Sequence, residues 1–438
     1  MRLSGPKALA IGEAIIGFTP KPRHAHYCDF NDDQGQLLDS GLALYFANPH
    51  SFTGEDVFEF QGHGGPVVLD WLLARTLALG ARLARPGEFS ERAFLNDKID
   101  LTQAEAIADL IDAASQSAAR NALNSLQGQF KIQVQQLVEQ LIALRIYVEA
   151  AIDFPEEEVD FLSDGKVAEQ LSAVIEQTQR LLGKAQQGAI IREGLNLVIA
   201  GKPNAGKSSL LNALAERESA IVTDIAGTTR DILKEHIQID GLAIHLTDTA
   251  GLRDTDDHVE KLGVDRARTA IAQAQQILVV IDAQRLTSAS LNDQLAQELT
   301  DLAIDPSSSQ MTLVINKIDV NPISSPSNWP ETWHNHAMVV VSAKTGQGLD
   351  QLKQHIKSQA GLQSASEGQF TARTRHIHAL QRALDYLHTG QQQIQHHQAG
   401  ELLAEDLRLA QQCCDEITGQ FTSDDLLGRI FSSFCIGK

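Results

Sequence analysis

The spacing of apolar residues changes along the chain and divides it into regions with different predicted structures. Ala8–Phe18 and Pro66–Leu79 carry apolar residues every three or four positions, which predicts helices. Leu42–Phe46 and Asp56–Phe60 are short and rich in apolar and aromatic residues, which predicts strands. Together these elements predict a small mixed α/β domain over residues 1–98.

The turn after the second of these strands contains Gly62, His63, Gly64 and Gly65. A histidine among glycines could belong to an active-site loop. Glycines are also what a tight strand-to-helix connection requires, and this second interpretation is the commoner one. The sequence leaves both open.

Residues 99–191 and 360–438 have the three- and four-residue apolar spacing of helices. Pro155 interrupts the first of these regions and should end or turn its helix. Between the two lies a region of a different kind, residues 192–359. We therefore expect one helical domain built from two segments, with another domain inserted between them.

Residues 192–359 alternate between short apolar strands and helical stretches, which is typical of a mostly parallel sheet with crossover helices. The strands are expected at Leu195–Ala200, Ile244–Asp248, Ile277–Ile281, Thr312–Ile315 and Met338–Val341. The expected fold class is therefore multidomain, with α/β and all-α parts.

Composition narrows the setting in which this fold works. The chain has 36 Lys and Arg against 56 Asp and Glu, a net charge of −20, so it should be soluble and should repel nucleic acid except at a local basic patch. No apolar run approaches the roughly 20 residues of a membrane span, and no signal peptide opens the chain. The four cysteines, Cys28, Cys413, Cys414 and Cys435, form no CxxC pair or disulfide framework. These features predict a cytoplasmic protein with no membrane contact.

The candidate chemistry centres on Gly201–Ser208, which reads Gly-Lys-Pro-Asn-Ala-Gly-Lys-Ser between a predicted strand and a predicted helix. This is the order and spacing of a phosphate-binding loop. Its glycines let successive backbone N–H groups face phosphate oxygens, and the helix N-terminus adds partial positive charge. Lys207 would reach the β- and γ-phosphates, and Ser208 would ligate Mg²⁺.

Further motifs follow in the order that a guanine nucleotide hydrolase requires. Thr223–Thr229 lies where a switch loop would bind Mg²⁺ only when γ-phosphate is present, and Asp248–Gly251 ends a strand near the metal. Asn316–Asp319 ends another strand, and its aspartate can accept two hydrogen bonds that guanine offers and adenine does not. Ser342–Lys344 ends the last strand, beside the base. We therefore expect a Ras-like P-loop GTPase domain. The expected nucleotide contacts are Asn204, Ala205, Gly206, Lys207, Ser208, Ser209, Thr223, Asp224, Ile225, Ala226, Gly227, Thr228, Thr229, Asp248, Thr249, Ala250, Gly251, Asn316, Lys317, Ile318, Asp319, Ser342, Ala343 and Lys344.

One position departs from Ras-like enzymes, which use a glutamine after the Asp-Thr-Ala-Gly motif to orient the attacking water. Leu252 stands there and has no polar side-chain atom. Asn204 and the Thr223–Thr229 stretch offer oxygens for a monovalent cation, which would stabilise charge as an arginine finger does. Glu260 could orient the water, although an isolated glutamate is more commonly a surface charge.

The chain resembles the MnmE (TrmE) family of tRNA-modifying GTPases over essentially its whole length. The terminal Cys-Ile-Gly-Lys is the most specific part of the resemblance. The segments that carry it are Ser51–Asp56, Gln61–Gly65, Arg85–Arg92, Asn96–Lys98, Leu144–Pro155, Phe421–Ile430 and Phe434–Lys438.

The resemblance implies a folate-binding and dimerisation domain over residues 1–98, a helical domain over 99–191 and 360–438, and a GTPase domain over 192–359. It also implies a homodimer held by the N-terminal domains, in which the GTPase domains come together when K⁺ and GTP are bound. The residues it assigns to K⁺ are Asn204, Thr223, Thr228 and the carbonyl of Ile225; those for Mg²⁺ are Ser208 and Thr229, and Glu260 orients the water.

The family acts with a flavoprotein partner, MnmG (GidA), in an expected heterotetramer. The resemblance implies transfer of an aminomethyl or carboxymethylaminomethyl group to C5 of the tRNA wobble uridine, with a tetrahydrofolate as the one-carbon source. A derivative like 5-formyl-tetrahydrofolate would contact Arg2, Glu59, Lys98 and Lys438. Cys435 is a catalytic candidate, although an inert thiol explains it equally well.

Met1–Ser4 resembles the end of a strand whose beginning is absent. Family members begin about twenty residues earlier, with a strand and a proline- and glycine-rich loop. A protein that begins at Met1 would have one strand fewer in its N-terminal sheet, which should weaken folate binding through Arg2 and dimerisation.

A regulatory or ribosome-assembly GTPase without modification activity is the alternative. The GTPase motifs do not separate the two functions, because both classes share them. The N-terminal segments and Cys435–Lys438 favour tRNA modification.

Overall fold

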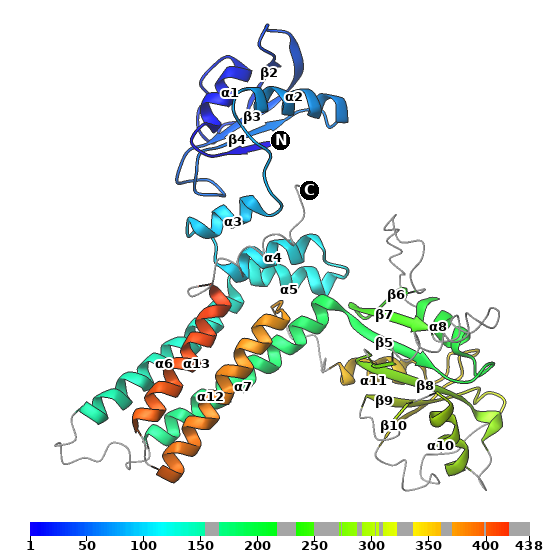
Figure 1. Cartoon of the computed structure of the whole chain (residues 1–438). Helices are drawn as coiled ribbons and strands as arrows, with labels where there is room; N and C mark the ends of the chain where they lie inside the picture. The colour runs from blue at the N-terminus through cyan, green and yellow to red at the C-terminus, as the bar shows by residue number, and fades with distance from the viewer. Residues whose placement is uncertain are drawn as a thin grey trace. The chain divides into compact units, whose positions relative to one another are not determined.

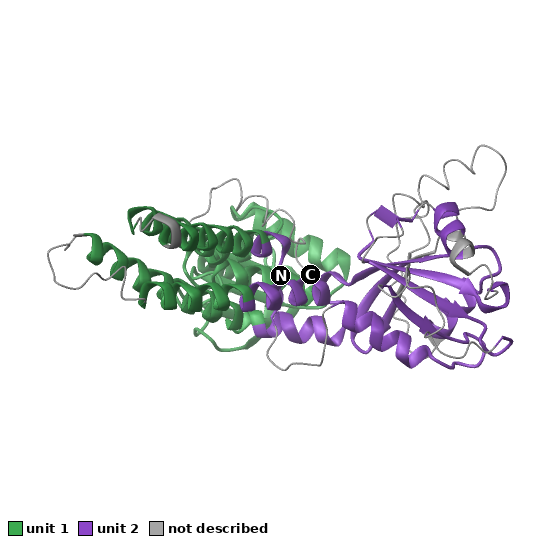
Figure 2. Cartoon of the chain, turned by 90° about the horizontal axis from the view of Figure 1, so that it is seen from below, with its two compact units in different colours: residues 1–111, 125–179, 378–438 green, residues 112–124, 180–377 purple. Residues whose placement is uncertain are grey.

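The computed structural model describes residues 1–153, 166–216, 234–248, 271–272, 274–286, 291–302, 304–305, 310–321, 336–360, 370–397 and 400–419. The chain divides into two compact units (Figure 2). The first comprises residues 1–111, 125–179 and 378–438, and the second comprises residues 112–124 and 180–377. No helix in the described part of the chain is both long enough and apolar enough to cross a membrane.

The first unit begins with a four-stranded antiparallel sheet in the order β1-β4-β3-β2 (Figure 1). Its strands are β1 (Arg2–Ser4), β2 (His26–Asn31), β3 (Leu37–Phe46) and β4 (Val57–Gln61). Helices α1 (Ala8–Ile16) and α2 (Pro66–Ala78) contribute to one core with one face of this sheet. That core includes Ile11, Ile15, Phe30, Ala43, Phe58, Phe60 and Leu72.

The helical part of the first unit joins segments that are far apart in the sequence. It contains α3 (Glu88–Leu95), α4 (Leu101–Ile111), α6 (Gln129–Asp153) and α13 (Gly400–Thr418). Helix α13 packs along α6, and Arg145 Nη1 donates to Gln411 Oε1 at 2.8 Å across 266 residues of sequence. Helices α5 (Gln116–Leu126), α7 (Lys166–Glu193) and α12 (Thr374–His397) each run through both units.

The second unit contains a six-stranded sheet in the order β10-β9-β8-β5-β7-β6. Strands β5 (Leu195–Ala200), β7 (Leu242–Asp248), β8 (Gln276–Asp282), β9 (Met311–Asn316) and β10 (Ala337–Val340) are parallel, and β6 (Lys234–Ile239) pairs antiparallel to β7. Helices α8 (Lys207–Glu216) and α11 (Leu349–Gln359) share a core with one set of strand residues, and α10 (Leu291–Asp301) shares a second core with the alternate set. The sheet is therefore covered on both faces, as a parallel sheet requires.

This architecture confirms the expected multidomain α/β and all-α fold, with a mostly parallel sheet in the inserted region. Each of the strands expected between Leu195 and Val341 is present. Pro155, which was expected to end or turn its helix, lies outside the described residues. Strands β2 and β6 were not expected. Both are the last strands of their sheets within the described residues, and their sequences are too polar to read as buried strands.

Candidate functional site

The loop between β5 and α8 is shaped by positive backbone φ angles at Gly201 (153°), Asn204 (65°) and Gly206 (93°). A Cβ on Gly201 would lie 2.4 Å from the carbonyl oxygen of Val280, and a Cβ on Gly206 would lie 2.3 Å from Asn316 Nδ2. Both positions therefore require glycine. A backbone that curls in this way ahead of a helix N-terminus is a ready anion-binding cradle.

Lys207 is the first residue of α8 and is buried. Its Nζ donates to the carbonyl oxygens of Gly201 at 2.8 Å and Lys202 at 3.0 Å, so the ammonium lies within the curl of the loop. Phosphate oxygens are acceptors of the same kind and could take over these donors. Asn204, Ser208 and Ser209 are exposed, so their side chains are open to a ligand.

The end of β9 meets this loop directly. Asn316 Nδ2 donates to the carbonyl oxygen of Ala205 at 3.0 Å, and Asn316 Oδ1 accepts from the backbone N–H groups of Lys317 at 2.8 Å and Ala343 at 3.1 Å. Asn316 is buried, so these bonds fix its amide. The structure thus brings together the phosphate-binding loop, Asn316–Asp319 and the segment that begins at Ser342.

Asp319 is oriented by the same strand ends. Ser342, which is fully buried, donates from Oγ to Asp319 Oδ1 at 2.7 Å. The backbone N–H of Ile318 donates to the carbonyl oxygen of Val341 at 3.4 Å. An aspartate held by one oxygen presents its other oxygen for base recognition.

Lys317 links the base-recognition segment to the phosphate-binding loop. Its Nζ donates to the carbonyl oxygen of Asn204 at 2.6 Å and to Asp282 Oδ2 at 2.7 Å. Asp282 ends β8 and is buried. The sequence reasoning missed Asp282, although its position at the end of a parallel strand, beside β9, is the signal that identified its neighbours.

The remaining predicted nucleotide contacts are only partly visible. Asp248 ends β7 opposite Ile199 of β5, which places its backbone at the same edge of the sheet. The rest lie outside the described residues: Thr223, Asp224, Ile225, Ala226, Gly227, Thr228, Thr229, Thr249, Ala250, Gly251, Leu252 and Glu260. Cys435 and Lys438 lie outside them as well.

The N-terminal sheet brings two of the predicted folate contacts together. Arg2 and Glu59 are register partners on β1 and β4, and Arg2 Nε donates to Glu59 Oε1 at 2.7 Å. The Arg2 guanidinium also lies 5.8 Å from the ring centroids of Phe52 and Phe89. Lys98 Nζ donates instead to the carbonyl oxygen of Pro49 at 3.0 Å.

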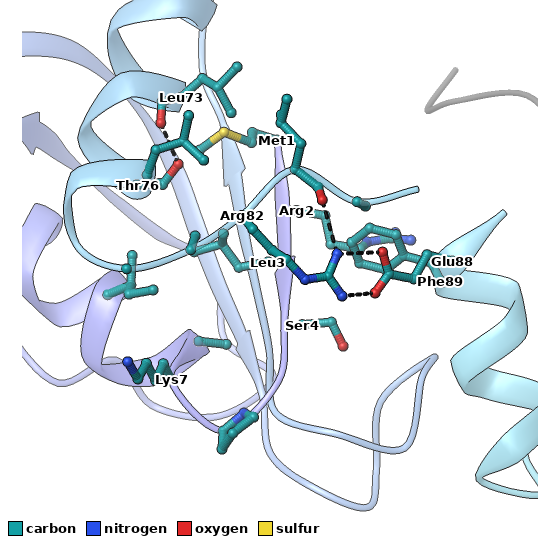
Figure 3. Close-up of a pocket in the computed structure, with 18 of the residues that line it drawn as sticks. Met1, Arg2, Leu3, Ser4, Lys7, Leu73, Thr76, Arg82, Glu88 and Phe89 are labelled. Carbon is teal, nitrogen blue, oxygen red and sulfur yellow. Dashed lines mark hydrogen bonds and ion pairs between the residues drawn. The ribbon is translucent and has the colours of Figure 1, made fainter. Parts of the chain in front are cut away.

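A cavity of about 340 Å³ opens beside Arg2 (Figure 3). Its walls come from β1, α1, the last turns of α2 and residues 80–92. Met1, Leu3 and Phe89 supply apolar surface, whereas Arg2 and Lys7 add positive charge. A cavity of this composition suits a partly apolar ligand that carries an anionic group.

Glu88 closes one side of this cavity, and its pKa is strongly lowered. Its carboxylate accepts from Arg82 Nη1 at 2.8 Å, from the backbone N–H of Arg85 at 2.8 Å and from Arg92 Nη2 at 2.8 Å. The Arg82 hydrogen bonds, with help from Arg85 and Arg92 and against the effect of burial, lower the pKa of Glu88 to about 2. Arg92 continues the network to Glu55 at 2.9 Å.

Comparison with known proteins gives this architecture a family. A model of the MnmE helical domain matches residues 101–435, and a model of the GTP-binding protein TrmE N-terminus matches residues 1–98. The chain belongs to the MnmE family. Its membership confirms the resemblance that the sequence motifs carried.

Two relatives match along the whole chain. The tRNA modification GTPase MnmE of Saccharophagus degradans is 60% identical over 438 residues, which cover 100% of this chain and 95% of that protein. The MnmE protein of Hydrogenovibrio crunogenus is 61% identical over 440 residues, with the same coverage of 100% and 95%. A solved G domain of the T. maritima FeoB iron transporter is 25% identical and covers 37% of this chain and 97% of its own, with a TM-score of 0.27.

Proposed function

We propose that this member of the MnmE family is a K⁺-activated GTP hydrolase that takes part in modification of the tRNA wobble uridine. The observation that carries the proposal is the junction between the phosphate-binding loop and the guanine-recognition segment. That junction consists of the hydrogen bonds from Asn316 to Ala205 and from Lys317 to Asn204. Two relatives of this chain, from different organisms, are named tRNA modification GTPases.

The residues that would hold GTP fit the chemistry of a guanine nucleotide. The loop from Gly201 to Ser208 would surround the phosphates, Lys207 would contact the β- and γ-phosphates, and Asp319 would bind guanine. Ser208 lies in the first turn of α8 and is exposed, as a Mg²⁺ ligand must be. Thr229 would be its partner ligand, and Mg²⁺ would neutralise phosphate charge.

The proposed K⁺ site rests on Asn204, whose side chain is exposed beside the loop while its backbone carbonyl is held by Lys317. Thr223, Thr228 and the carbonyl of Ile225 would complete it with oxygen ligands. K⁺ would supply positive charge near the transferring phosphoryl group, where Leu252 supplies no polar atom. Glu260 would orient the attacking water.

The N-terminal domain is proposed to hold a tetrahydrofolate derivative. Glu59 can accept hydrogen bonds from the amide and amine donors of a pterin. Arg2 donates to Glu59, and the Arg2 guanidinium lies over the rings of Phe52 and Phe89. Lys98 and Lys438 are the remaining proposed contacts. Bound folate would supply the one-carbon unit, and a flavoprotein of the MnmG (GidA) type would be the partner for C5 substitution.

The proposed domains are residues 1–98 for folate binding and dimerisation, 99–191 and 360–438 for the helical domain, and 192–359 for GTP hydrolysis. The packing of α13 against α6 supports a helical domain that closes around an insertion. We also propose that the protein forms a homodimer through its N-terminal domains and a heterotetramer with the flavoprotein. The proposed location is the cytoplasm. Cys435 is kept as a candidate for the modification chemistry.

Hydrolysis rates in different salts test the GTPase half of the proposal. We expect GTP hydrolysis to be much faster in KCl than in NaCl at equal ionic strength, because only K⁺ would fill the site at Asn204. Glu260→Ala should remove most of the hydrolysis while GTP affinity stays nearly unchanged. Equal rates in the two salts would refute the cation role.

Nucleoside mass spectrometry of tRNA tests the modification half. A strain that lacks this chain should lose the C5 substituent of the wobble uridine, and the intact gene should restore it. Unchanged wobble uridines in the deletion strain would sink the proposal and leave a GTPase switch in its place.

A further inference from the structure

The connection between β4 and α2 contains a histidine bound to a buried carboxylate. Asp39 Oδ1 lies 2.8 Å from His63 Nδ1, and Asp39 Oδ2 accepts the backbone N–H of His63 at 2.8 Å. Asp39 Oδ1 also accepts the backbone N–H of Ser40 at 2.8 Å. The Asp39 side chain is 8% exposed, so the carboxylate is largely shielded from solvent.

These hydrogen bonds fix the state of the imidazole. Hydrogen bonds from His63 and from the backbone N–H groups of Ser40 and His63 outweigh burial and lower the pKa of Asp39. The carboxylate is therefore ionised at neutral pH and can only accept, so His63 Nδ1 must carry the donated hydrogen. In the neutral ring, Nε2 is then a free proton acceptor.

The second ring nitrogen is open to solvent. The His63 side chain is 79% exposed, and within the described part of the chain Nε2 makes no hydrogen bond. A Cβ on Gly62 would lie 2.2 Å from Asp39 Oδ2, whereas a Cβ on Gly64 would meet nothing within 4 Å. Gly62 is therefore needed to form the pair, and no described residue crowds the loop at Gly64.

A purely structural role explains only part of this arrangement. The backbone N–H of His63 already donates to Asp39, which holds the loop between β4 and α2 against β3. The hydrogen bond between the His63 ring and Asp39 adds little to the stability of the loop, because an exposed imidazole contributes little packing. What the ring bond does fix is the tautomer and the direction of Nε2, as in sites where a carboxylate orients a catalytic histidine.

We propose that Asp39 and His63 form a proton-transfer pair that acts on an amine nitrogen of a reduced folate bound to the N-terminal domain. The inference rests on the proposed folate function. His63 follows Glu59 by four residues, roughly 13 Å of extended chain at most. If Glu59 binds the pyrimidine edge of the pterin, the amine nitrogens that carry a one-carbon unit lie further along the ligand.

The chemistry is a balanced proton transfer. When such an amine adds to the carbonyl carbon of an aldehyde-level one-carbon donor, the nitrogen lone pair makes the carbon–nitrogen bond, the C=O π pair moves to the oxygen, and a cationic N–H remains. Its proton moves to His63 Nε2, the N–H electron pair stays on the nitrogen, and Asp39 stabilises the imidazolium. The reverse transfer protonates the nitrogen as the bond breaks, and neither direction needs an oxidant or a reductant.

Histidine-labelled full-length protein tests the geometry by NMR, with 5-formyl-tetrahydrofolate as the probe. In the neutral ring the hydrogen should lie on Nδ1 and not on Nε2, and the His63 signals should shift when the folate saturates the protein. His24, an exposed histidine of the same domain, is the control and should not shift. Spectra of His63→Gln assign the signal.

Turnover of tRNA modification with the flavoprotein partner tests the role. His63→Gln should lower the modification rate about 100-fold, while folate affinity and GTP hydrolysis stay within twofold and His24→Gln leaves all three unchanged. Folate binding that leaves the His63 signals in place, or a His63→Gln protein with the full modification rate, would overturn the pair. A wild-type protein that binds no folate would overturn the folate function as well, which separates the two failures.

Discussion

Glu88 offers the most direct test of how the N-terminal domain is held together. Glu88 is 4% exposed, lies in the first turn of α3 and accepts hydrogen bonds from Arg82, Arg85 and Arg92. Glu88→Gln keeps the shape of this side chain and removes its charge. The two arginines then face an amide, which accepts through one oxygen only.

The pKa of Glu88 sets the size of the effect. Folding lowers it from 4.5 to about 2, and each unit corresponds to roughly 1.4 kcal/mol, so the ionised carboxylate contributes at most about 3 kcal/mol at neutral pH. Arg82 is 61% exposed and therefore partly screened, so we expect Glu88→Gln to cost about 2–3 kcal/mol. Because the pKa is lowered, this stability is complete above about pH 4.5 and is lost as pH falls toward 2.

Hydrogen exchange of the amides in α3, followed by mass spectrometry on the full chain, measures this local free energy. Glu91→Gln is the matched control, because Glu91 lies in the same helix and pairs with the 67% exposed Arg85. We expect the control to change the free energy by less than about 0.5 kcal/mol. The difference in the free energy of local opening between wild type and Glu88→Gln should fall by more than half between pH 7 and pH 3. A loss no larger than that of Glu91→Gln, or a gap independent of pH, would refute the reasoning.

Two further substitutions test other buried carboxylates. Asp282→Asn should weaken GTP binding about tenfold in titration calorimetry, because Lys317 loses the charge that holds it against the loop. The control is Asp301→Asn, at a carboxylate that pairs with Lys202 and accepts a hydrogen bond from Gln297, and it should leave GTP affinity nearly unchanged. Equal effects of the two substitutions would contradict the role of Asp282. Asp406→Asn should raise the free energy of unfolding by about 1 kcal/mol at pH 7, because burial raises the pKa of Asp406 and its Oδ2 has no hydrogen-bond partner among the described residues. Because folding raises the pKa of Asp406, the folded state binds its carboxyl proton more tightly, so the stability gained by Asp406→Asn should disappear as pH falls below about 4. Urea unfolding measures this free energy. The control Asp385→Asn, at an exposed carboxylate, should change neither the stability nor its pH dependence.

The sequence was sufficient for those parts of the fold that depend on local pattern. Apolar period located the central strands, and the rule that parallel strands end at one edge of a sheet placed Asn316 beside the phosphate-binding loop although 111 residues separate it from Ala205. Pattern failed where the environment is half solvent, as at the edge strands β2 and β6. The pattern also did not predict the hydrogen-bond partners of Glu88 and His63, because only the tertiary fold brings Arg82, Arg92 and Asp39 to them.

The nucleotide site shows why those tertiary contacts matter for function. Asn204 and Lys317 are both non-glycine residues with positive φ, 65° and 67°, a conformation that costs about 1 kcal/mol or more for each. The two meet in one hydrogen bond of 2.6 Å, and Asp282 anchors the lysine at 2.7 Å. Strain in the loop between β5 and α8 is thus offset by the segment that is proposed to bind the base, so the two halves of the proposed nucleotide site support each other's shape. A nucleotide that satisfies one half should therefore find the other already formed, which makes Asp282, remote from the chemistry in sequence, a determinant of affinity for the whole ligand.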